Sequence, residues 1–322
     1  MTRPPSTKAL KEQSASGLAY SLSAYGLWGI LPGYFILLQP TGPFEIVAWR
    51  VVLSVAFCAI LISVVRGWRR TGTLLRDRRV MAWLALAAAF IGVNWTVFVY
   101  ATATDQVVEA SLGYFINPII TILLGVIFLR ERMRPLQWTA VGIAFIAVLV
   151  LAIGHGTFPW VALALAFSFG FYGLVKNRTG GRVDAVSGLA IETAYLTPIA
   201  VLVLIGVALS WQPVDTHGAG ITLGAFGVWH TIALSLAGVI TTVPLLLFAA
   251  GVRRLPLSYV GLTQFLAPVL QFLTGVILLG EPMPLERWIG FGIVWVALIV
   301  LVIDMVRAIV RNRRAADVPE LT

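Results

Sequence analysis

Long apolar runs separated by short polar connections dominate the chain. Ten runs reach the roughly 17–25 residues that a helix needs to cross a bilayer. They are 17–37, 44–65, 80–103, 107–129, 136–153, 158–175, 185–208, 229–251, 256–279 and 285–306. The connections are short, except for 66–79 and 209–228. The pattern predicts an all-α polytopic membrane protein with ten transmembrane helices.

Basic residues mark alternate connections. All 23 lysine and arginine residues, except Arg50 and Arg287, lie in the two tails or in the connections near 66–79, 130–134, 176–182 and 253–254. Lysine and arginine favour cytoplasmic loops. The tails, 1–16 and 307–322, are therefore predicted to be cytoplasmic. The first run is too long for the core of a signal peptide and is interpreted as an uncleaved span of a multi-pass protein in the cytoplasmic membrane.

One stretch of sequence occurs twice, 150 positions apart. The segment Glu109–Pro118 opens an apolar run that ends near Glu131, and the segment Ser258–Pro268 opens another that ends near Glu281. The chain is therefore predicted to hold two repeats, 17–153 and 158–306. Each repeat has five spans, an odd number, so the second enters the membrane inverted. In secondary transporters of this build the substrate site lies near mid-membrane between the repeats.

Composition and charge narrow the classes of function. The chain is 59% hydrophobic and only 11% charged, which is too few charges for a water-facing surface. The net charge of +9 comes from blocks between apolar runs, so it indicates a lipid bilayer as partner rather than nucleic acid. The single cysteine, Cys58, excludes an intramolecular disulfide and a cysteine-based metal cluster. The three histidines have no metal-ligand spacing, and no phosphate-binding loop is present, so no metal or cofactor is predicted.

Three charged residues inside predicted spans are candidates for substrate binding or gating. Charges within a membrane are costly and mark transport pathways by default. Arg50 and Glu192 occupy equivalent places in the two repeats, in the outer and inner half respectively. Glu109 shares the depth of Arg50 and could form a pair with it that opens as substrate or a proton arrives; the alternative is a permanent ion pair that only joins two spans. Glu45, at the rim of its span, is interpreted as a solvated helix end or a partner of Arg50.

Neutral polar and aromatic residues form a second set of candidates. Tyr114 and Asn117 are three residues apart and share a helix face, and Gln264 aligns with Tyr114 across the repeat. Such groups can hydrogen-bond a solute, although they also hold membrane helices together. Repeat-related rings can stack on a planar solute or merely pack. The candidates are Asn94, Trp95, Tyr114, Asn117 and Gln264, with the repeat-related pair Trp28 and Tyr172. Glu131 and Glu281 are interpreted as surface-facing helix-end residues with a structural role.

Several stretches resemble the EamA family of the drug/metabolite transporter superfamily. They include Trp28–Pro32, Glu45–Arg50, Gly92–Trp95, Leu163–Val175, Ile191–Thr193 and Thr241–Leu245, and Glu109–Pro118 is specific to one subgroup of that family. The resemblance covers essentially the whole chain. It implies a ten-span transporter of the inner membrane, and it favours export.

These observations predict a secondary transporter that moves a small metabolite or drug-like solute by alternating access. Arg50 favours an anionic or zwitterionic group on the solute, and an amino acid or an amphipathic drug fits. Protons are a candidate coupling ion, through Glu109 or Glu192. The alternatives are an oligomeric channel or sensor without turnover, and a membrane-embedded lipid-modifying enzyme. The enzyme is disfavoured because no intramembrane acid/base cluster or metal motif is present.

Overall fold

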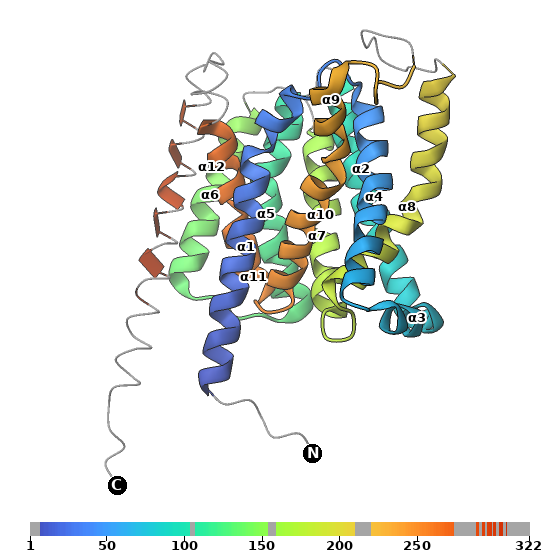
Figure 1. Cartoon of the computed structure of the whole chain (residues 1–322). Coiled ribbons are helices and arrows are strands. Elements are labelled where there is room, and N and C mark those ends of the chain that lie inside the picture. The colour runs from blue at the N-terminus through green and yellow to red at the C-terminus, as the bar shows by residue number, and fades with distance from the viewer. Residues whose placement is uncertain are drawn as a thin grey trace.

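The protein is a bundle of long helices, as Figure 1 shows for the computed structural model. The structure describes residues 7–103, 107–153, 159–209 and 220–273. It also describes residues 288, 289, 292, 293, 295–297, 299, 300, 303, 304 and 307. All regular secondary structure in this described part is helical. The prediction of an all-α fold is thereby confirmed for these residues.

The first half of the chain forms α1 (Thr7–Ile36), α2 (Pro43–Val64), α3 (Trp68–Arg76), α4 (Arg78–Ala103), α5 (Val107–Leu129) and α6 (Pro135–Ile153). The second half forms α7 (Trp160–Thr179), α8 (Ala185–Ala208), α9 (Gly227–Ser235), α10 (Ala237–Val252), α11 (Leu257–Gln264) and α12 (Leu266–Leu273). The predicted spans 256–279 and 285–306 extend outside the described residues.

The break between α11 and α12 has a local cause. Proline lacks a backbone N–H, and its ring clashes with the carbonyl four residues earlier. For Pro268 that residue is Gln264, where α11 ends. The predicted span 256–279 therefore begins as two short helices rather than one continuous helix.

Five helical segments are long and apolar enough to cross a membrane, judged by length and composition within the described residues. They are α2, Arg78–Ala101 of α4, α7, α8 and the segment Gly227–Val252. Three shorter apolar helices accompany them. Large apolar side chains also stand on the outside of the bundle, such as Ile60, Leu202 and Trp229, with exposed fractions of 59%, 66% and 84%. Such an outer surface suits lipid rather than water. The count of ten spans stays a prediction.

The connection at 66–79 contains a helix, α3, which the hydrophobic pattern did not predict. It lies across one end of the bundle (Figure 1). Thr71 of α3 hydrogen-bonds Ser187 of α8 (2.9 Å), and Arg70 pairs with Asp184 at 3.2 Å. This contact holds the basic connection against the start of α8.

The basic connections gather at the end of the bundle that carries α3. The turns after α5, α7 and α10 lie there, whereas the turn between α1 and α2 lies at the opposite end together with α9 (Figure 1). This grouping follows the alternation of charge along the sequence. Which end faces the cytoplasm stays a prediction.

The helices pack in a small number of extensive pairs. α5 packs against α7 and α11, α1 against α10 and α12, α2 against α8 and α10, and α4 against α7 and α8. Small residues allow close approach between membrane helices. At Gly238 of α10 an added Cβ would lie only 2.5 Å from the backbone carbonyl carbon of Leu53 in α2, so only glycine fits at that crossing.

Candidate functional site

Arg50 lies about two turns into α2 and is directed into the bundle. Its Nε donates a hydrogen bond to Oγ1 of Thr241 in α10 at 2.8 Å. Its Cζ lies 5.6 Å from the ring centroid of Phe35 in α1 and 5.4 Å from that of Trp95 in α4. These distances are within the range of cation–π attraction. Three helices besides α2 thus surround one guanidinium group.

The terminal nitrogens of Arg50, Nη1 and Nη2, differ from Nε in their contacts. Within the described residues, neither Nη1 nor Nη2 has a hydrogen-bond partner, and neither is among the atoms that are buried without a partner. Tyr34 and Tyr114 lie close enough to interact electrostatically with Arg50. The sequence predictions for Arg50, Trp95 and Tyr114 therefore converge on one place in the fold. Phe35, Tyr34 and Thr241 belong to this place too, but sequence reasoning did not select them.

The predicted pairing of Arg50 with Glu109 concerns a side chain outside the described part of the structure. The backbone of Glu109 belongs to the first turn of α5. The pairing stays a prediction.

The interpretation of Glu45 was wrong. Its side chain is buried, with 2% exposure, and it is neither a solvated helix end nor, within the described residues, a partner of Arg50. Its Oε1 accepts bonds from the backbone N–H of Thr222 (2.8 Å), from the Thr222 hydroxyl (3.1 Å) and from Nε1 of Trp49 (3.1 Å). The segment that contains Thr222 folds back over the start of α2. The polar pattern of the connection 209–228 does not predict this contact.

A chain of hydrogen bonds leads from Glu45 to His230. An ionised carboxylate only accepts, so the Thr222 hydroxyl donates to Glu45 and accepts from the Thr41 hydroxyl at 2.8 Å. Thr41 must then accept from Nε2 of His230, also at 2.8 Å. This sequence of donors assigns the Nε2–H tautomer to His230. Its Nδ1 is buried and has no partner in the described structure.

Glu192 in α8 is fully buried and forms an ion pair. Its Oε1 lies 2.8 Å from Nζ of Lys176 in α7, and its Oε2 accepts a bond from the Tyr172 hydroxyl at 3.1 Å. The side chains of Lys176 and Glu192 are 6% and 2% exposed. The sequence pattern places Lys176 in a basic connection, and this is wrong, because Lys176 lies within α7 and its side chain is buried. The sequence held one indication of this position: Tyr172 and Lys176 are four residues apart and therefore share a helix face.

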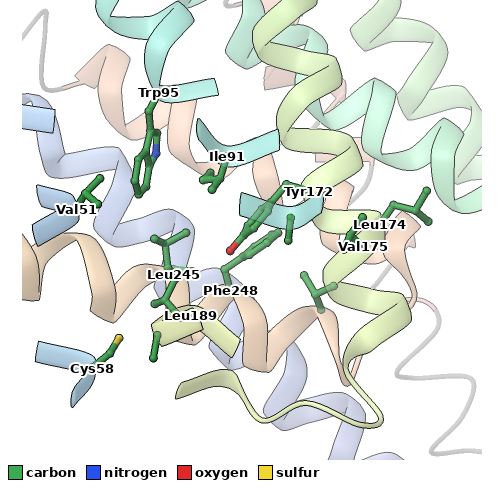
Figure 2. Close-up of a cluster of buried hydrophobic side chains, with 14 of the residues drawn as sticks. Val51, Cys58, Ile91, Trp95, Tyr172, Leu174, Val175, Leu189, Leu245 and Phe248 are labelled. Carbon is green, nitrogen blue, oxygen red and sulfur yellow. The ribbon is translucent and has the colours of Figure 1, made fainter. Parts of the chain in front are cut away.

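The repeat-related rings Trp28 and Tyr172 meet at the same residue. Phe248 of α10 stacks on Tyr172 (5.9 Å between centroids, 14° between planes), and its centroid lies 5.7 Å from that of Trp28. Figure 2 shows Tyr172 and Phe248 side by side in the buried cluster, with Trp95 above them. The rings of Trp28, Tyr172 and Phe248 therefore contact the Lys176–Glu192 pair through the Tyr172 hydroxyl. They pack in the same buried cluster as Trp95, whose ring lies beside Arg50.

The neutral polar candidates divide into two groups. Nδ2 of Asn94 donates to the Leu165 carbonyl and to the Ser168 hydroxyl, both at 3.0 Å, which favours the helix-packing alternative for Asn94. Gln264 accepts a bond from Thr121 at 3.3 Å. Nε2 of Gln264 and Oδ1 of Asn117 are buried without a partner in the described part of the chain. These two amides lie on α11 and α5, which pack together.

Glu131 joins the two halves of the chain. Its carboxylate oxygens accept bonds from the backbone N–H groups of Leu257 (2.6 Å) and Ser258 (2.7 Å) at the start of α11. An acidic group there satisfies free N–H donors and the helix dipole. The predicted helix-end role of Glu131 is confirmed, although the residue is half-buried rather than surface-facing. Glu281 lies outside the described residues.

Comparisons with known proteins give one consistent family. The EamA-like transporter family matches residues 15–153 and 159–303. Protein RarD of Streptomyces exfoliatus is 44% identical over 306 residues, which cover 95% of this chain and 94% of that protein. An uncharacterized transporter of Vibrio cholerae is 38% identical over 305 residues, with coverages of 95% and 98%. A solved structure described as a crystal structure of a protein aligns with a TM-score of 0.62 at 19% identity, over 88% of this chain and 97% of that one. That likeness concerns the fold alone. The prediction of the EamA family, with its RarD subgroup, is confirmed.

Proposed function

Because the chain belongs to the EamA-like transporter family and is a membrane transporter of the drug/metabolite superfamily, we propose that it is a secondary transporter. It moves a small solute across the cytoplasmic membrane by alternating access, with export as its direction. Its ten transmembrane helices form two inverted repeats, 17–153 and 158–306, and both tails are cytoplasmic. The membrane-embedded enzyme is set aside, since the family is one of transporters and the described residues hold no group of three or more His, Cys, Asp or Glu side chains that could bind a metal.

The pattern of helix contacts supports the inverted repeats. If α1 corresponds to α7, α2 to α8, α4 to α10, and α5 to α11–α12, each contact between helices predicts a second one. The contact of α4 with α7 predicts that of α10 with α1, and the contact of α5 with α7 predicts that of α12 with α1. The contact of α2 with α10 predicts that of α8 with α4. All of these pairs occur, and α2–α8 and α5–α11 correspond to themselves.

The observation that carries the substrate site is that Nη1 and Nη2 of Arg50 have no hydrogen-bond partner among the described residues. A guanidinium within a membrane is costly unless it is paired, and its two terminal nitrogens match a carboxylate geometrically. We assign this edge to an anionic or zwitterionic group of the solute, such as that of an amino acid. The rings of Trp95, Trp28 and Tyr172, with Tyr114, Asn117 and Gln264, line the route for the rest of the solute.

The ion pair of Glu192 and Lys176 supports coupling to protons. Protonation of Glu192 removes the negative charge that neutralises Lys176 and therefore weakens the link between α7 and α8. In this proposal a proton on Glu192 accompanies the change of access, and Glu109 is a second candidate for the same role. Glu192→Gln should then abolish uphill transport while sparing exchange. Flux in proteoliposomes that follows no pH gradient would remove the coupling.

The decisive experiment combines binding and transport. A thermal-shift screen of the purified protein against metabolites identifies a stabilising solute, and the screen is repeated with Arg50→Ala. Stabilisation that survives the substitution unchanged removes Arg50 from the binding site. The solute that is found is then loaded into proteoliposomes. Saturable counterflow supports a carrier, whereas unsaturable flux without counterflow indicates a channel.

A further inference from the structure

We propose that Thr241 is a positioning residue that turns the Arg50 guanidinium so that a carboxylate of the cargo binds end-on, through Nη1 and Nη2. This inference rests on the proposed function, because it describes how the same site recognises its solute. It adds a residue that no comparison assigns.

The packing of α10 on α2 fixes Thr241 in place. Gly238 permits the closest approach of the two helices, and the Ser54 hydroxyl donates to the Gly238 carbonyl at 3.2 Å. Thr241 lies three residues after Gly238, and Arg50 lies three residues before Leu53, so each shares a helix face with the crossing point. Thr241 is 2% exposed, and its hydroxyl is therefore a rigid acceptor.

The bond to Thr241 selects one of two modes of carboxylate binding. An arginine can present either its Nε and one Nη, or both Nη atoms, as a pair of parallel donors. Thr241 occupies Nε at 2.8 Å, so the first mode is blocked. The rings of Phe35 and Trp95 lie against the guanidinium, and the edge with Nη1 and Nη2 is what remains for a ligand. A planar carboxylate with a ring behind it matches this edge and its aromatic surroundings.

The neighbouring residue Thr242 offers a matched control. It is also buried, with 0% exposure, but its hydroxyl has no partner among the described residues. Thr241→Val and Thr242→Val therefore remove the same atom from adjacent buried positions. Thr241→Ser keeps the acceptor, so it separates loss of the hydroxyl from loss of the methyl group.

The test measures dissociation constants of benzoate and of its neutral analogue benzamide, by titration of thermal stability for the purified full-length protein. The wild type should bind benzoate more tightly than benzamide. Thr241→Val should weaken benzoate by about tenfold or more, tenfold being the lower end of the range for a lost hydrogen bond to a charged group, and leave benzamide unchanged. Thr241→Ser and Thr242→Val should both stay close to the wild type.

The outcomes separate this inference from the function on which it rests. Unchanged benzoate affinity in Thr241→Val, together with loss of benzoate binding in Arg50→Ala, would overturn the role of Thr241 and leave Arg50 as the anion site. Equal weakening of benzoate and benzamide would overturn it too, because a general packing defect has that effect. A wild type that does not distinguish the two probes would overturn the anion site itself, whereas the transport proposal is judged separately by counterflow.

Discussion

The buried pair of Lys176 and Glu192 permits a double-mutant test of how the protein holds charge in its interior. The single variants are Lys176→Met and Glu192→Leu, and the double variant carries both changes. Each single change leaves one charged group with 6% or 2% exposure without its ionic partner. Removal of one member of a buried pair costs about 3–5 kcal/mol of unfolding free energy.

The double variant should be far less destabilised than the sum of the two single variants. Replacement of a buried pair by apolar residues of similar size is often neutral or better. One cost remains, because the Tyr172 hydroxyl, which donates to Glu192 at 3.1 Å, loses its acceptor. An unsatisfied buried hydroxyl costs about 1–3 kcal/mol, and the double variant should lose no more than this.

Thermal unfolding in detergent provides the assay. At about 2–4 °C per kcal/mol, each single variant should lower the midpoint by about 6–20 °C. Arg178→Met is the matched control, because it removes a basic charge two residues later in α7 from an exposed side chain, whose bond to the Phe128 carbonyl (3.1 Å) is also exposed. This control should change the midpoint little. Additive losses in the double variant, or single losses as small as that of Arg178→Met, would refute the idea that each charge is tolerated in the interior because the other neutralises it.

Four further predictions concern stability and use the same assay. Glu45→Gln replaces an acceptor of three hydrogen bonds and should cost about 1.5–3 kcal/mol. His230→Gln, which keeps a donor at the position of Nε2, should be milder than His230→Leu; equal losses would contradict the assigned tautomer. Glu131→Ala removes the acceptor at the start of α11 and should cost about 0.5–2 kcal/mol, and an unchanged midpoint would show that water replaces it. Gly238→Ala should destabilise the protein because its Cβ would meet Leu53 at 2.5 Å, whereas at Gly142 an added Cβ meets nothing within 4 Å. Equal destabilisation by Gly238→Ala and Gly142→Ala would contradict the close approach of α10 to α2 at Gly238.

The helical class and the family were predictable because both depend on patterns that are local in sequence. A long apolar run predicts a helix whatever its neighbours are, and clusters of arginine mark its ends. The bounds of α2, α5 and α8 accordingly agree with the predicted runs to within about two residues. The helix α3 was missed because its apolar face is short and three of its nine residues are arginine.

The contacts of the charged residues were not predictable, since each depends on helices that are distant in sequence. Lys176 follows an apolar run and looks like the start of a basic loop. α7 continues past it to Thr179, and its ammonium group is buried against Glu192 of α8. Glu45 starts a helix and looks solvated, but the segment with Thr222 covers it. In both cases the sequence shows a charged residue beside an apolar run, but it does not show which residue this charge contacts.

The two proposed repeats use charge in opposite ways, and this difference supports the proposed place of solute binding. Arg50 and Glu192 occupy equivalent positions in α2 and α8. Glu192 is neutralised within the protein by Lys176 at 2.8 Å. Arg50, in the described part of the structure, has a threonine and aromatic rings but no carboxylate within ion-pair distance. A guanidinium in that setting gains most from an anion that arrives with the solute.

The carboxylate that binds Arg50 should therefore stabilise the protein. Arg50→Lys, which keeps the charge but loses the fork-shaped pair of donors, should retain only part of that stabilisation in a thermal-shift titration with benzoate. Full retention would show that charge alone, and not the geometry set by Thr241, governs the site.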